Sequence, residues 1–207
     1  MYERYGDLHW WPADTADEVI IGAVLTQNTS WKNVEKCMER LRSEKLNTLK
    51  AISGASLHTI SENIRSSGFY NQKAQRLKMI SVSIVRVYGS LERMCNKNSE
   101  ELEKFLSSLR GVGPETMESI MLYACEKPFF VVDKYTVRIL GRVGFRDIER
   151  GTLRSLVEAE FHGDLKKLKN YHAMFVETGK NYCKKVPDCD GCPLNKVCSY
   201  SMERRLP

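Results

Sequence analysis

Apolar residues recur along this chain at the three- and four-residue spacing of helices that bury one face. The first clear case follows Thr15-x-x-Glu18, a capping box that predicts a helix start near Ala16. Four apolar residues then form the stripe that such a helix buries, namely Val19, Ile20, Ala23 and Val24. The pattern therefore predicts a buried helix beginning at about residue 16.

The same periodicity covers most of the remaining sequence. The expected helical segments are residues 30–41, 56–64, 72–88, 98–109, 114–124, 134–143, 152–160 and 165–180. No strand-like pattern is longer than FFVV at residues 129–132. We therefore expect an all-α fold, without a low-complexity linker or a solenoid repeat.

Residues 109–116 read LRGVGPET and separate two of the expected helices. Gly111 can adopt a positive φ and end a helix, Gly113 lets the backbone approach another object closely, and Pro114 suits the first position of the next helix. A helix that starts at such a hairpin presents free N–H groups, which can bind a phosphate of a nucleic-acid backbone. An ordinary turn between helices explains the stretch equally well.

Asp133 follows the FFVV run and precedes the helix expected from Lys134. An aspartate at this place can serve simply as the N-cap of the helix. Its position, about twenty residues beyond the hairpin with one helix between, adds a catalytic interpretation.

The seven cysteines fall into two groups. Cys37, Cys95 and Cys125 lie in helical contexts and are expected to be small buried hydrophobes. The other four have the spacing Cys183-x5-Cys189-x2-Cys192-x5-Cys198. Because no secretory signal is recognisable, this cluster favours a metal site over disulfides, and either an iron–sulfur cluster or zinc accepts four thiolates.

The net charge of +6 and the pI near 8.9 are compatible with a polyanionic partner but do not require one. No run approaches about 18 apolar residues, so we expect no membrane partner and a cytoplasmic protein.

Together these motifs resemble the helix-hairpin-helix DNA glycosylase superfamily, in particular its endonuclease III branch. The hairpin segment LRGVGPETMESIMLYA, the aspartate segment VVDKYTVRIL and the cysteine loop carry the resemblance, with AVLTQNTSWKNV and IRSSGFYNQKAQRLK. The N-terminal HWWPADTADEVIIGAVLTQNTSW and VVDKY look most like 3-methyladenine DNA glycosylase III. That enzyme lacks the cysteines, and the first cysteine gap is one residue shorter here than in the family pattern.

The resemblance implies a two-domain fold. A central helical domain would span residues 19–127, and residues 1–18 with 128–207 would form the second domain, with the DNA cleft between them. It also implies a [4Fe–4S] cluster at residues 183–198, with zinc as the alternative. The cluster would hold Lys184, Lys185 and Lys196 against phosphate. A monomer acting on double-stranded DNA with a damaged base is the family expectation.

The resemblance assigns roles to individual residues. Asp133 would be catalytic, Gln27 would fill the gap left by the flipped nucleotide, and Phe69 would act as a wedge at the same step, with core packing as its alternative. The hairpin residues expected at DNA are Gly111, Val112, Gly113, Glu115 and Thr116. The residues expected around the base are Trp10, Trp11, Pro12, Trp31, Lys134 and Lys180.

Glu115 occupies the position at which lyase relatives carry a lysine. A carboxylate cannot form an imine, so we expect a monofunctional glycosylase in which water is the nucleophile and Asp133 stabilises the oxocarbenium-like sugar. Lys134 remains a candidate substitute amine. Tryptophan faces attract a cationic base by about 0.5–2 kcal/mol, which favours an alkylated purine such as 3-methyladenine. An endonuclease III-like glycosylase and AP lyase for oxidised or mismatched pyrimidines, and a DNA-binding protein without catalysis, stay open.

Overall fold

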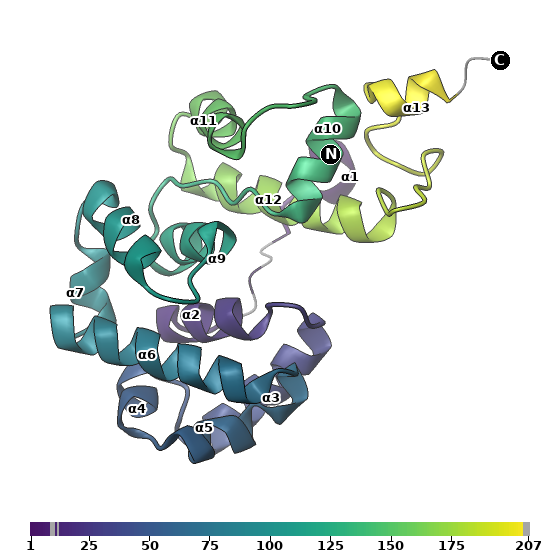
Figure 1. The fold of residues 1–207 in the computed structure, drawn as a ribbon. Helices are drawn as coiled ribbons and strands as arrows, with labels where there is room; N and C mark the ends of the chain where they lie inside the picture. The colour runs from purple at the N-terminus through teal and green to yellow at the C-terminus, as the bar shows by residue number, and fades with distance from the viewer. Residues whose placement is uncertain (9–10, 12, 205–207) are drawn as a thin grey trace. The chain divides into compact units, whose positions relative to one another are not determined.

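The computed structural model describes residues 1–8, 11 and 13–204 (Figure 1). Within these residues the regular structure is entirely helical, which confirms the expected all-α class. Packing divides the chain into two compact units, Met1–Trp11 with Pro128–Pro207 and Pro12–Lys127. The sequence predicts domains at residues 19–127 and at residues 1–18 with 128–207, and this division stays a prediction.

The unit Pro12–Lys127 is built around α2 and α6. Its elements are α2 (Ala16–Leu25), α3 (Trp31–Ser43), α4 (Leu49–Gly54), α5 (Leu57–Asn63), the 3-10 turn η1 (Arg65–Ser67), α6 (Tyr70–Tyr88), α7 (Leu91–Cys95), α8 (Ser99–Ser108), α9 (Pro114–Ser119) and the π-helix η2 (Ile120–Ala124). Helix α2 is apolar on nearly every side and is buried from Glu18 to Leu25, as a helix at the centre of a core must be. Helix α6 packs on α4 and α5 (Figure 1).

The start of α2 shows how the local sequence sets a boundary. The Thr15 hydroxyl accepts a hydrogen bond from the Glu18 N–H at 3.3 Å, which is the capping interaction that the sequence predicts. The Glu18 carboxylate accepts in turn from the Asp14 N–H at 3.1 Å. Because these bonds satisfy N–H groups that lack a partner inside the helix, α2 begins at Ala16 as expected.

The other unit combines the N-terminal residues with four later helices. Its elements are α1 (Tyr2–Tyr5), α10 (Lys134–Val143), α11 (Arg150–Phe161), α12 (Leu165–Asn181) and α13 (Ser199–Glu203). Asn170 of α12 accepts from the Leu8 N–H and donates to the Gly6 carbonyl, both at 2.9 Å. These bonds fasten the segment after α1 to α12, while α10 packs along the same helix.

The predicted helices are present, and α10 has the expected ends. The sequence missed α1, α4, α7 and α13, each of six residues or fewer and too short to show a helical period. The FFVV run does not form a strand; it is a buried extended segment that leads into α10. In the described part of the chain, no helix is long and apolar enough to span a bilayer.

Two of the three cysteines expected to be small buried hydrophobes are joined to each other instead. Cys95 at the end of α7 and Cys125 just after η2 form a disulfide, with 4.6 Å between their Cα atoms. Sequence spacing could not show this pairing, because the two residues lie 30 positions apart and meet only after the helices pack. Cys37 is free and fully buried, as expected.

Candidate functional site

The hairpin forms at the place that the sequence predicts. Gly111 has φ +91°, Gly113 is the N-cap of α9 and Pro114 opens that helix. A Cβ atom on Gly111 would lie 2.8 Å from Cγ of Arg76, so only glycine fits there. Gly113, Pro114 and Glu115 are exposed, whereas Val112 is buried beneath the turn.

Gln27 lies in the loop after α2 and is bonded to this hairpin. Its Nε2 donates to the Gly111 carbonyl at 3.3 Å and to the Thr116 hydroxyl at 3.1 Å. Arg76 of α6 donates to Gln27 Oε1 at 2.6 Å. The structure therefore brings together Gln27, Gly111 and Thr116, three of the predicted DNA-binding residues, and adds Arg76 to them. Sequence reasoning missed Arg76 because one arginine on a helix usually marks a solvated face.

Phe69 is 67% exposed, which excludes the core-packing alternative. It is the N-cap of α6 and has a left-handed backbone with φ +46°, directly after Gly68 at φ +69°. A phenylalanine in this conformation is uncommon, and such strain concentrates at functional sites. An exposed aromatic ring on a rigid helix start suits the predicted wedge role.

Asp133 caps α10 and is 5% exposed. Its Oδ1 accepts from the Thr136 N–H at 2.7 Å, so the N-cap interpretation holds in the structure. Its Oδ2 lies 3.9 Å from Nε2 of His172 on α12. Burial lowers the pKa of His172, an effect that the nearby Asp133 carboxylate partly opposes. His172 is therefore neutral near pH 7 and adds no positive charge beside Asp133.

The predicted base-pocket residues are not assembled within either unit. Trp10 and Pro12 lie outside the described residues, and Trp11 is partly buried. Trp31 begins α3 and packs on α2, where a Cβ on Gly22 would lie 3.4 Å from its ring. Lys134 is exposed with its ammonium 5.7 Å from the Tyr135 ring centre, and Lys180 is exposed and paired with Glu177 at 3.3 Å. The predicted pocket thus stays a prediction.

Arg142 of α10 organises the cysteine loop. It donates to Cys183 Sγ at 3.1 Å and to the Lys184 carbonyl at 2.7 Å, and Cys198 Sγ donates to its carbonyl at 3.3 Å. Burial raises the pKa of the Cys192 thiol, and the charges of the other three cysteines of the loop raise it further. Among the residues that the structure covers, however, no three cysteine, histidine or acidic side chains converge closely enough to hold a metal ion.

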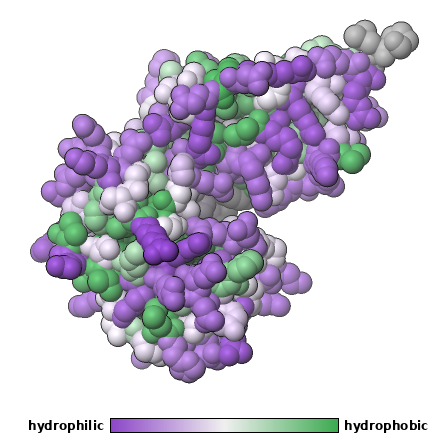
Figure 2. Space-filling model, in the orientation of Figure 1, coloured by the Kyte–Doolittle hydropathy of each residue, from purple (hydrophilic) through white to green (hydrophobic). Residues whose placement is uncertain are grey.

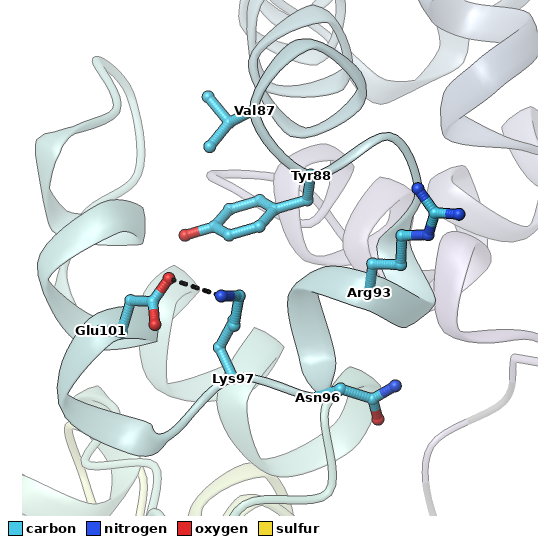
Figure 3. Close-up of a pocket in the computed structure, with 6 residues that line it drawn as sticks. All are labelled: Val87, Tyr88, Arg93, Asn96, Lys97 and Glu101. Carbon is cyan, nitrogen blue, oxygen red and sulfur yellow. Dashed lines mark ion pairs between the residues drawn. The ribbon is translucent and has the colours of Figure 1, made fainter.

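An open cavity of about 560 Å³ lies at the C-terminal end of α6 (Figure 3). Six residues of α6, α7, α8 and the turns between them line it, namely Val87, Tyr88, Arg93, Asn96, Lys97 and Glu101. Lys97 pairs with Glu101 at 3.4 Å, shown dashed in Figure 3. None of the predicted functional residues belongs to this cavity.

The face of the molecule in Figure 2 carries mostly hydrophilic residues, with hydrophobic side chains in separate areas. The exposed apolar residues include Phe69 at 67% and, in the cysteine loop, Val186 at 82% and Val197 at 60%. An excess of basic residues, 32 against 26 acidic ones, accompanies this surface. Such a surface can meet a polyanion.

A glycine hairpin between two helices, followed by a buried aspartate that caps a later helix, defines the helix-hairpin-helix class of base excision repair proteins. The family described as HhH-GPD superfamily base excision DNA repair protein matches residues 21–162, and the chain belongs to this family. The match includes the hairpin, Gln27, Phe69 and Asp133.

Several known proteins are similar to this chain over most of their length. A provisionally assigned DNA repair glycosylase of Methanocaldococcus jannaschii is 42% identical, covering 96% of this chain and 92% of its own. Endonuclease III of Buchnera aphidicola is 31% identical, with 88% and 81% covered. The crystal structure of H. pylori 3-methyladenine DNA glycosylase bound to 1,N6-ethenoadenine is 30% identical, with a TM-score of 0.77 and 86% and 93% covered.

Proposed function

We propose that this chain is a monofunctional DNA glycosylase that removes a damaged base, in first place an alkylated purine such as 3-methyladenine. Its enzyme class, DNA N-glycosylase, is that of the family to which it belongs. The observation that carries the proposal is Asp133, a buried carboxylate fixed at the start of α10.

Asp133 is suited to stabilise positive charge on the sugar. The Thr136 N–H holds one carboxylate oxygen, which fixes the orientation of the group. The other oxygen faces His172, whose pKa is lowered by burial, so no imidazolium neutralises the carboxylate near pH 7. A fixed anion in a site of low dielectric constant stabilises an oxocarbenium-like transition state, and it can orient or deprotonate the attacking water.

Glu115 supports the monofunctional assignment. It is exposed in the first turn of α9, at the position where the lysine of lyase relatives is expected. A carboxylate there cannot attack C1′ to form an imine. Lys134, next to Asp133 in the sequence, is the amine to test if lyase activity appears, and its ammonium lies beside the Tyr135 ring.

The lesion is proposed from the tryptophans and from one relative. The sequence Trp10-Trp11-Pro12 resembles the pocket segment of 3-methyladenine DNA glycosylase III, and the similar H. pylori enzyme was solved with a modified adenine. Indole faces favour a cationic base, whose charge also makes it a good leaving group. The second candidate is a pyrimidine lesion, and the 31% identity to an endonuclease III favours it.

The partner that we propose is double-stranded DNA, bound by a monomer in the nucleoid. The exposed N–H groups at the start of α9 would contact a phosphate through Gly113 and Glu115, and Phe69 would enter the stack. The four cysteines at residues 183–198 would hold a [4Fe–4S] cluster, which would fix the loop with Lys184, Lys185 and Lys196 against DNA. Metal analysis of the purified protein separates iron from zinc.

A gel assay on duplexes that each carry one lesion tests this proposal. Each reaction is split, and only one half is treated with hot alkali. We expect strand cleavage of the alkylated-purine duplex after alkali only. Cleavage without alkali would contradict the monofunctional assignment, and release from pyrimidine lesions only would contradict the proposed substrate.

The matched variant for this assay is Asp133→Asn. Asparagine also caps helices well, so the fold should persist. Base release should fall by roughly 100-fold or more, because the carboxylate charge and its base function are lost. Wild-type activity in the folded Asp133→Asn protein would refute the assignment of Asp133.

A further inference from the structure

Lys73 of α6 is a buried ammonium with an unusual pair of partners. Its side chain is among the largest that are fully buried, with 1% of the residue exposed. Its Nζ donates to the carbonyl of Leu25 at 2.8 Å and to the carbonyl of Ser67 at 2.7 Å. No carboxylate within the described residues pairs with it. Burial lowers its pKa, so keeping this group charged has a cost that the two carbonyls must offset.

Both carbonyls belong to helix ends. Leu25 is the last residue of α2, and Ser67 is the last residue of η1. The final carbonyls of a helix lack partners inside it and carry a partial negative charge, so a cation at this end is stabilising. One ammonium therefore caps two helices that lie about forty residues apart in the sequence.

The backbone turns sharply just after each capped end. Beyond Leu25 the chain passes through Gln27 to Asn28, which has φ +55°. Beyond Ser67 it passes through Gly68 at φ +69° to Phe69 at φ +46°. These left-handed residues are strained unless neighbouring contacts fix them, and Lys73 supplies one such contact at the base of each turn.

We propose that Lys73 is a positioning residue that holds the Gln27 loop and the Phe69 turn at a fixed separation, so that both side chains enter the DNA at the same base step. The inference rests on the proposed function, which assigns the gap-filling role to Gln27 and the wedge role to Phe69. Lys73 is too deeply buried to touch DNA, and it acts through the two loops.

The chain offers a matched control on the same helix. Lys78 lies five positions further along α6 and donates to the Ser53 and Ala55 carbonyls, both at 2.6 Å. These carbonyls mark the end of α4, where no DNA-binding residue is predicted. Lys73→Met and Lys78→Met thus remove the same kind of helix cap, and thermal melts should show that both lower stability.

The binding assay uses a DNA duplex for which the identity of the excised base does not need to be known. A duplex with a tetrahydrofuran abasic analogue mimics the flipped nucleotide, and 2-aminopurine opposite the analogue reports unstacking by its fluorescence. For Lys73→Met we expect about a tenfold loss of preference for this duplex over undamaged DNA and a smaller fluorescence gain. Affinity for undamaged DNA should change little, and Lys78→Met should behave like the wild type.

The outcomes separate this inference from the proposed function. If the wild type does not prefer the abasic duplex, the proposed function and this inference both fail. If the wild type prefers it and Lys73→Met keeps that preference and the fluorescence gain, only this inference fails. If Lys73→Met does not fold, Lys73→Gln takes its place, because its side chain is one bond shorter and uncharged and cannot donate to both carbonyls as the ammonium does. An unchanged preference in that variant would overturn the inference.

Discussion

Glu18 is a buried carboxylate that accepts hydrogen bonds from two side chains on other segments. Arg42 donates to its two carboxylate oxygens at 2.8 and 2.6 Å, and Asn47 donates at 3.0 Å. With 2% of its side chain exposed, the carboxylate depends on these donors in place of water. The Arg42 guanidinium lowers the pKa of Glu18 from 4.5 to about 2. The stability of the N-terminal part of the Pro12–Lys127 unit is thereby linked to pH.

The sign of this linkage follows from the lowered pKa. Above pH 4.5 Glu18 is ionised in both the folded and unfolded states, and its contribution to stability is complete. As the pH falls towards 2 the unfolded state gains the proton first, and about 3 kcal/mol is lost. We expect Glu18→Gln to remove this part of the acid sensitivity, as measured by urea unfolding between pH 5 and pH 2.

Glu62→Gln is the control for this measurement. Glu62 pairs with Arg65 at 2.8 Å, but both side chains are more than a third exposed, so the pair should contribute at most about 0.5 kcal/mol. An equal loss of acid sensitivity in both variants would show that the buried geometry of Glu18 is not the cause.

Single residues differ in how far the sequence reveals them. The hairpin glycines, Asp133 and Phe69 could be named beforehand, because each stands in a motif with a fixed local geometry. Lys73, Arg76 and His172 could not, since each acts through a residue on another helix or loop. In the sequence they are an ordinary lysine, arginine and histidine on helices.

In the hairpin, backbone conformation restricts which residue can occupy position 111. Gly111→Ala would put a Cβ atom 2.8 Å from Cγ of Arg76 at a residue with φ +91°. We expect a loss of about 1–3 kcal/mol in unfolding free energy, from the left-handed backbone and the displaced arginine. Weaker binding to an abasic duplex should accompany it, because Arg76 and Gly111 both hold Gln27.

Gly113→Ala provides the comparison two positions away. Gly113 has φ −83°, and no heavy atom lies within 4 Å of a Cβ placed on it. Its loss of stability should stay below about 1 kcal/mol, which is the cost of alanine at a helix N-cap. Equal destabilisation of the two variants would contradict the steric argument for Gly111.

Helices as elements were predicted where they are long. A stripe of apolar residues and a capping box fixed the start of α2, and Asn98 capped α8 as expected, accepting from the Glu101 N–H at 2.9 Å. Short helices such as α4 and α7 depend on the neighbours they pack against, so the sequence period could not show them. The sequence period also could not show η2, the π-helix that follows α9.

At the scale of the whole molecule, the disulfide between Cys95 and Cys125 joins two residues that lie 30 positions apart in the sequence. It closes a segment that includes α8, the hairpin and α9. Closing a loop of about thirty residues stabilises a protein by about 3–4 kcal/mol in the chain-entropy model. We expect a reductant to lower the melting temperature of the wild type, measured by circular dichroism.

The double variant Cys95→Ala/Cys125→Ala tests the source of that effect. It should melt at the lower temperature whether or not reductant is present. A further drop on reduction would place the effect in another part of the chain, such as the cysteine loop at residues 183–198.

The π-helix has a consequence for how this chain tolerates changes of length. In η2 the Cys125 N–H bonds to the Ile120 carbonyl, five residues back, so this turn accommodates one residue more than an α-turn. Deleting one residue between 120 and 124 would let the turn return to α pitch, and Cys125 would still lie about one turn beyond Ile120. Homologues with a single-residue gap here can therefore keep cysteines at both positions 95 and 125, and an alignment of the family can be searched for that combination.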